Sequence, residues 1–203
     1  MKLNVKRTVL VGLAFMTISG FWQLYDFMIP LILKDVFYVS DTISGFVMAL
    51  DNILALILMP LFGSLSDKVS TKFGKRMPFI VVGTIVTTLT LLLIPTAATQ
   101  KSLVMFIVGL GIVLLALAMY RSPAVALMPD VTLKPLRSKG NAIINLMGAV
   151  GGVTVLGIVI LLGPAKTMSY FPSFIATSLF MLIPVLTMVI FVKENPWADE
   201  TKA

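Results

Sequence analysis

Six apolar runs of about 20 residues or more follow one another along this chain, separated by short polar connections. The runs cover about residues 8–33, 43–63, 77–97, 103–126, 140–163 and 173–193. Because roughly 20 apolar residues let a helix cross the hydrocarbon core of a bilayer, each run predicts one membrane-spanning helix. The expected fold is an all-α membrane protein, with a six-helix transmembrane bundle over residues 1–193 and a polar tail at 194–203.

Composition supports a membrane protein and leaves no stretch for a separate soluble domain. The chain of 203 residues is 58% hydrophobic and only 12% charged, whereas soluble domains carry about 25% charged residues. The first run follows a basic start, as in a secretory signal. However, it is longer than the roughly 7–15 apolar residues of a signal peptide and contains Trp22 and Asp26. It is therefore predicted to be a membrane span.

Several classes of chemistry are excluded by missing residue types. The chain has no cysteine and no histidine, which excludes disulfides, the usual zinc sites and Ser-His-Asp catalysis. It also has no G-x-x-x-x-G-K-[ST] phosphate-binding loop. We therefore expect no enzyme activity, no cofactor and no metal site. The glycines of GAVGG (148–152) are instead predicted to permit close helix packing.

Lysine and arginine placement predicts the topology. Twelve of the 16 such residues fall at one side of the predicted bundle: Lys2, Lys6, Arg7, Lys68, Lys72, Lys75, Arg76, Lys134, Arg137, Lys139, Lys193 and Lys202. Such residues favour the cytoplasmic side of a membrane. Both termini are thus expected in the cytoplasm, at the plasma membrane, with the cations attracted to anionic lipid head groups and not to nucleic acid.

The connection GSLSDKVSTKFGKRMPF (63–79) concentrates four of these cations. Anchoring of the chain on the cytoplasmic side of the membrane would explain the four cations but nothing else in the stretch. It would not require Gly63, Asp67, Gly74 and Pro78 at these spacings. The stretch is therefore predicted to have a second role.

This connection resembles the signature of the major facilitator superfamily, G-x-L-[AS]-D-[RK]…G-[RK]-[RK], between the second and third spans. The longer spacing KVSTKF between Asp67 and Gly74 looks like the glycoside-pentoside-hexuronide:cation symporters, and most like their sucrose/proton branch. RSPAVALMPD (121–130) and RSKGNAIINLMGAVGG (137–152) resemble the fourth and fifth spans of that branch. Family members have two six-span halves, so the resemblance implies an N-terminal half, with the tail at the start of the central loop. A second six-helix half, from another chain or a copy of this one, is expected as partner.

The resemblance also implies a conformational latch in this connection. In such transporters the acid and cations bond to helix ends of the other half, where a carboxylate is favoured at a helix N-terminus. The residues carried over are Gly63, Asp67, Lys68, Gly74, Lys75 and Arg76. The alternative is an ordinary loop acid, with Asp67 bonded to Lys68 or Lys72.

Three ionisable residues lie inside the spans, where charges are costly and usually functional: Asp26, Asp51 and Arg121. A helical rise of about 1.5 Å per residue places Asp26 roughly 10 Å and Asp51 roughly 12 Å from the same end of the bundle. Arg121 lies nearer the opposite end and is not expected to reach them. We expect Asp26 or Asp51 to take up a proton and couple transport to the proton gradient. The alternative is that each acid only bonds to Tyr25, Asn52 or Gln23.

Polar stripes on the spans suggest where a sugar could bind. Ser19, Gln23, Asp26 and Pro30 share one helical face, and Asn141, Asn145, Gly148 and Gly152 share another. The predicted sugar contacts are Gln23, Tyr25, Asn52, Arg121 and Asn145. Arg121 could instead extend to lipid head groups.

Two departures from the sucrose branch concern the coupling ion and the sugar. The branch usually has an acid where this chain has Leu114, and its arginine aligns with Val125. Sodium-using members often have two acids in the second span, whereas this chain has only Asp51, which favours proton coupling. The resulting prediction is half of a proton-coupled sugar symporter working by alternating access. The alternatives are a non-transporting membrane subunit and an inactive truncated fragment.

Overall fold

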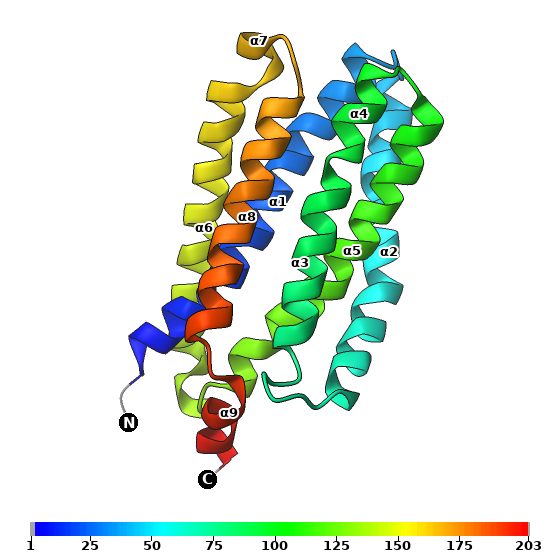
Figure 1. The fold of residues 1–203 in the computed structure, drawn as a ribbon. Helices are drawn as coiled ribbons and strands as arrows, with labels where there is room; N and C mark the ends of the chain where they lie inside the picture. The colour runs from blue at the N-terminus through cyan, green and yellow to red at the C-terminus, as the bar shows by residue number, and fades with distance from the viewer. Residues whose placement is uncertain (1–2, 203) are drawn as a thin grey trace.

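A computed structural model describes residues 3–202 of the chain, which are helical apart from short connections (Figure 1). Lys2, one of the cations assigned above to the cytoplasmic side, lies outside the described residues. The helices are α1 Val5–Asp35, α2 Asp41–Lys68, α3 Met77–Leu91, α4 Leu93–Thr99, α5 Leu103–Asp130, η1 Lys134–Leu136, α6 Arg137–Leu162, α7 Pro164–Thr167, α8 Phe171–Phe191 and α9 Glu194–Lys202.

The six predicted spans are confirmed as six helical segments long and apolar enough to cross a membrane. Two of them are composite: α3 and α4 form the third span, with a break at Leu92, and η1, α6 and α7 together form the fifth. Both chain termini lie at one end of the bundle (Figure 1), here called the termini end. The α2–α3 and α5–α6 connections lie at this end too, so the predicted cationic connections share one side.

Polar residues fix where several helices begin. Asn4, Ser40 and Ser102 precede α1, α2 and α5 in extended conformations, and each side chain accepts a hydrogen bond from an N–H of the first turn. A short polar side chain at this position satisfies an amide that has no partner within the helix. Proline near the first position of α3 and α8 serves a related purpose, because its ring needs no such partner.

Helix α1 lies at the centre of the bundle and packs against α5, α6 and α8. Its contact with α6 is very close: a Cβ atom added to Gly151 would lie 2.0 Å from the Met16 carbonyl oxygen, and one added to Gly148 would lie 2.8 Å from Ser19 Oγ. Only glycine fits the approach of position 151 to the backbone of Met16. The prediction that GAVGG permits close helix packing is therefore confirmed.

Helix α2 is the least covered span of the described bundle. Only 6% of its apolar stretch is buried, compared with 56% for α1 and 50% for α5. It is joined to α5 by a hydrogen bond in which Ser122 Oγ donates to the Met59 carbonyl oxygen at 2.8 Å. One side of the bundle, along α2, thus exposes a long apolar helix face.

Candidate functional site

The predicted polar stripe on α1 lies partly on an uncovered face. Asp26 is exposed and Gln23 is half-buried, next to Gly152 of α6. No hydrogen bond or ion pair among the described residues involves the Asp26 carboxylate. An ionisable group inside a span with no such partner is a candidate for a functional site.

Tyr25 does not share this face. Its side chain is only 3% exposed and packs in the core, where its ring stacks on Phe21 at 5.9 Å and meets Trp22 edge-on at 5.3 Å. The Tyr25 hydroxyl is buried and has no hydrogen-bond partner within residues 3–202. The helical period explains this placement, because Gln23 and Tyr25 are two residues apart and so point in directions about 160° apart.

The second predicted acid has a local partner. Asn52 Nδ2 donates a hydrogen bond to Asp51 Oδ1 at 3.0 Å on α2. One of the alternatives weighed above, an Asp51–Asn52 bond, is therefore present. Asp51 also lies near enough to Asp26 for their charges to interact, so α1 and α2 place the two acids in one region.

Arg121 lies over an aromatic ring on a neighbouring helix. Its guanidinium carbon is 5.0 Å from the centre of the Trp22 ring, a geometry in which the ring face attracts the cation. No ion pair of Arg121 with a carboxylate occurs in the described part of the chain, although Arg121 and Asp51 border the same small cavity. The Arg121–Trp22 contact was not predicted, since span depth alone did not place these residues together.

A small cavity connects these groups. Trp22, Asp51 and Arg121 line it from α1, α2 and α5, and its volume is about 20 Å³. Such a space holds about one water molecule, whereas pockets for small organic ligands measure roughly 300–1,000 Å³. A small organic ligand therefore does not fit in this space between the three helices.

Asn145, the remaining predicted sugar contact, is exposed on α6. Its neighbour in the same stripe, Gly148, is instead buried against Ser19 of α1. One part of the stripe on α6 therefore packs against α1, and another part lies on an open surface. The described hydrogen bonds do not connect Asn145 with Arg121, Asp26 or Asp51.

A second cluster of charges is at the termini end. Arg76 is almost fully buried; its guanidinium contacts Asp67 Oδ1 at 2.6 Å and Asp130 Oδ2 at 3.0 Å. It also donates to the Gly63 carbonyl oxygen and to Ser66 Oγ. A planar guanidinium with several fixed donors suits such a position. Arg76 thus holds the ends of α2 and α5 together.

The alternative partners considered for Asp67 are wrong. Among the described residues its carboxylate pairs with Arg76 and, at 3.6 Å, with Lys75, and not with Lys68 or Lys72. Lys75 also lies 3.7 Å from Asp130. The predicted latch residues Gly63, Asp67, Lys75 and Arg76 are therefore in contact within this chain, whereas a latch to another half stays a prediction.

Glu194 also belongs to this charge cluster at the termini end, and the sequence alone did not predict it. Its carboxylate accepts hydrogen bonds from the backbone N–H groups of Lys75 (2.9 Å), Arg76 (3.0 Å) and Met77 (2.9 Å), where α3 begins. A carboxylate is favoured there because the helix N-terminus carries a partial positive charge. The acid at the N-terminus of α3 is therefore Glu194 of α9, from the same chain.

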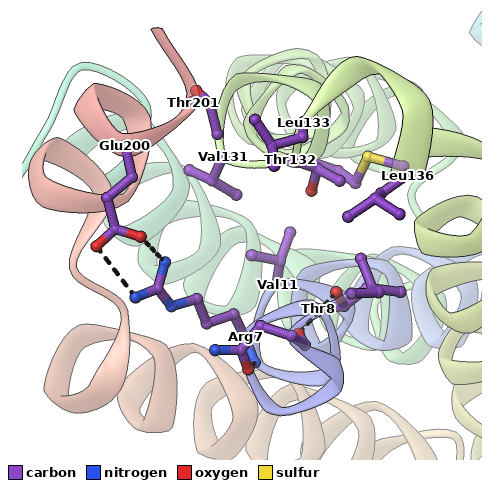
Figure 2. Close-up of a pocket in the computed structure, with 12 residues that line it drawn as sticks. Arg7, Thr8, Val11, Val131, Thr132, Leu133, Leu136, Glu200 and Thr201 are labelled. Carbon is purple, nitrogen blue, oxygen red and sulfur yellow. Dashed lines mark hydrogen bonds and ion pairs between the residues drawn. The ribbon is translucent and has the colours of Figure 1, made fainter. Parts of the chain in front are cut away.

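Helix α9 extends this contact across the termini end (Figure 2). Arg7 of α1 forms an ion pair with Glu200, and its guanidinium carbon lies 5.1 Å from the centre of the Trp197 ring. Thr201 Oγ1 donates to the Asp130 carbonyl oxygen at 2.9 Å. Arg7, Glu200 and Thr201 line a cavity of about 260 Å³ between α9, α1 and the end of α5. The hydrogen bond from Arg7 lowers the pKa of the Glu200 carboxyl below its usual value.

Comparison with known proteins identifies the family of this chain. Residues 11–203 match the Major Facilitator Superfamily. The chain is similar to the Sucrose transport protein SUC3 of Arabidopsis thaliana, with 26% identity over 196 residues, covering 79% of this chain and 32% of that protein. It is also similar to the Sucrose transport protein SUC4 of Arabidopsis thaliana, with 31% identity over 113 residues, covering 48% of this chain and 22% of that protein.

The chain spans about a third of the length of the first of these relatives, and the similarity falls in the N-terminal part of both. The family match covers all six spans apart from the start of α1. The predicted family, the six-span helical fold and the expectation of a non-enzyme are thereby confirmed. This chain is a multi-pass membrane protein and belongs to the Major Facilitator Superfamily of transporters.

Proposed function

We propose that the chain is one six-helix half of a proton-coupled sugar symporter that works by alternating access. The observation that carries this proposal is the Asp26 carboxylate: it lies inside a span, on an uncovered face, near Asp51, and without an ion pair among the described residues. Two acids in one region of low dielectric disfavour each other's charged form. One of them is therefore suited to take up and release a proton during transport.

A second six-helix half is part of this proposal. The cavity beside Trp22 and Arg121 is too small for a sugar, and only 6% of the apolar stretch of α2 is buried. A second bundle placed on this side would enclose the acids and create a binding space between halves, as transporters with repeated halves do near the membrane midplane. That half could be another chain or a copy of this one.

The sugar is suggested by the names of the relatives, both sucrose transport proteins. Gln23, Asn52 and Asn145 offer amide groups on open or half-open faces, and Arg121 offers a guanidinium beside Trp22. These are the proposed sugar contacts. Tyr25 is proposed to support them from the core, because its ring packs against Trp22.

The orientation follows from the cations. The termini end carries the lysines and arginines of the α2–α3 and α5–α6 connections, and such residues favour the cytoplasmic side. We place both termini in the cytoplasm and the chain in the plasma membrane. The tail 194–203 would then lead from the bundle toward the central loop, with α9 folded against the termini end.

The test is sugar uptake under an imposed proton gradient. The chain would be reconstituted in lipid vesicles, alone and with a second six-helix half. Labelled sucrose would be added on one side of the vesicle membrane. Asp26→Asn, Asp51→Asn and the double variant should lose gradient-driven accumulation. Asp41→Asn is the matched control, because Asp41 is an exposed acid at the start of α2 that pairs only loosely with Lys34, at 3.7 Å.

Each outcome separates the proposal from its rivals. Accumulation that persists in the double variant would refute proton coupling by these acids. Accumulation driven by a sodium gradient would identify the other ion. A stable complex with a partner but no flux would indicate a non-transporting subunit, and rapid degradation of the chain in every combination would indicate an inactive fragment.

A further inference from the structure

An apolar groove lies on the outer surface of the bundle at the termini end. The groove is lined by Met77, Pro78, Val81 and Val82 from the first turns of α3, by Val189 from the last turn of α8, and by Val192 directly after α8. Its volume is about 190 Å³. Val82 lies roughly 8 Å along the axis from the start of α3, so the groove begins at the level of the lipid head groups and extends into the acyl region.

A rigid turn forms one wall of this groove. Thr71 and Gly74 exchange two backbone hydrogen bonds of 3.3 Å and 3.1 Å, and Thr71 Oγ1 also donates to the Gly74 carbonyl oxygen. The turn presents Phe73, which is 70% exposed and lines the groove. Exposed Trp, Phe and Leu side chains enter the boundary between head groups and acyl chains when they lie at a membrane surface, so Phe73 is placed as an interfacial contact.

Two lysines flank the groove at the same end. Lys72 precedes Phe73, Lys193 follows Val192, and both are exposed. The two segments are held together by Asn195 Nδ2, which donates to the Thr71 carbonyl oxygen at 3.0 Å and to that of Lys72 at 3.4 Å. Neither lysine takes part in an ion pair with the described residues. The apolar groove is complementary to an acyl chain, and the two cations without ion pairs at its polar end are complementary to an anionic head group.

We propose that this groove binds one anionic phospholipid. An acyl chain would lie between α3 and α8, and the phosphate would lie near Lys72 and Lys193 beside the Phe73 turn. Such a site differs from general attraction of lipids to cations because it requires the groove and both lysines together. It depends on membrane placement of the chain and not on what is transported.

The experiment measures lipid binding directly. The full chain is purified in detergent, phosphatidylglycerol or phosphatidylcholine with identical acyl chains is added, and bound lipids are counted by native mass spectrometry. The variant Lys72→Ala/Lys193→Ala should weaken phosphatidylglycerol binding by about fivefold for each lysine removed, as for cations at an anionic membrane surface. Binding of phosphatidylcholine should change little.

Two further variants keep the proposal falsifiable. Lys134→Ala/Lys139→Ala removes the same charge from exposed positions at the same end but away from the groove, and it should leave the tightest phosphatidylglycerol bound. Val82→Trp fills the groove with an apolar side chain and should displace that lipid. Equal losses in the two lysine pairs, or unchanged binding in Val82→Trp, would overturn the proposal.

Discussion

Glu194 occupies the space that a side chain at Gly74 would need. A Cβ atom at Gly74 would lie 2.1 Å from Glu194 Oε2, and Gly74 has a φ of +115°, a conformation that other residues rarely adopt. Gly74, in the signature connection, therefore leaves room for the side chain of Glu194, which is 120 positions later in the chain. Conformation and close approach both require glycine here.

Gly74→Ala should destabilise the protein. A non-glycine residue in this backbone conformation costs roughly 1–3 kcal/mol, and the added methyl group would also displace Glu194 from the start of α3. Gly45→Ala is the control, because nothing lies within 4 Å of a Cβ at Gly45 in α2. The free energy of unfolding in detergent mixed with sodium dodecyl sulfate would measure both. Equal effects of the two substitutions would contradict this role of Gly74.

Glu194→Gln should be more damaging than Glu200→Gln, although both lie on α9. Glu194 is buried and accepts three backbone hydrogen bonds, and hydrogen bonds to a charged group contribute about 1.5–3 kcal/mol. Glu200 forms an exposed ion pair with Arg7, a kind of contact that contributes little. Thermal unfolding midpoints compare the two variants. A larger loss for Glu200→Gln would reverse the assignment.

The position of Arg7 over the Trp197 ring should depend on acidity through Glu200. Because Arg7 lowers the pKa of the Glu200 carboxyl in the folded protein, this pairing stabilises the folded state at neutral pH. The stabilisation is lost as pH falls below the usual glutamate range of about 4. Trp197 fluorescence in a Trp22→Phe background reports the change, since Arg7 lies over the Trp197 ring. Glu200→Gln should remove this acid transition, and its persistence in that variant would assign it to another group.

Gly151→Ala should loosen the contact between α1 and α6. Its added Cβ atom would lie 2.0 Å from the Met16 carbonyl oxygen, and overpacking of this kind costs roughly 1–3 kcal/mol. Gly157→Ala, on the same helix with nothing within 4 Å, is the control and should be neutral or slightly stabilising. The free energy of unfolding distinguishes them. Equal free energies of unfolding for these two variants would mean that α1 and α6 can move apart to accept the added methyl group without loss of stability.

The sequence was sufficient for the spans because run length alone determines whether a helix can cross a membrane. It also predicted that Lys75 and Arg76 share one end with both termini, and that the glycines of 148–152 pack against another helix. These features depend on local composition and spacing. They do not depend on which distant segments meet.

The positions of Glu194 and Tyr25 show where such reasoning fails. Glu194 begins a polar segment that looked like a simple tail, and only tertiary docking places it at the start of α3. Tyr25 was grouped with Gln23 for its chemistry, although the helical period separates them. The Arg121–Trp22 contact likewise needs the crossing of α1 and α5, which spacing along the chain does not specify.

The contacts of α9 also impose an order on synthesis. The amide of Lys75 and its acceptor on Glu194 are 119 residues apart, and Arg7 and Glu200 are 193 apart. While a ribosome makes the chain, the first turn of α3 must therefore enter the membrane with its amides uncapped. The termini end of the bundle is completed only after all six spans have emerged, so insertion precedes its final assembly.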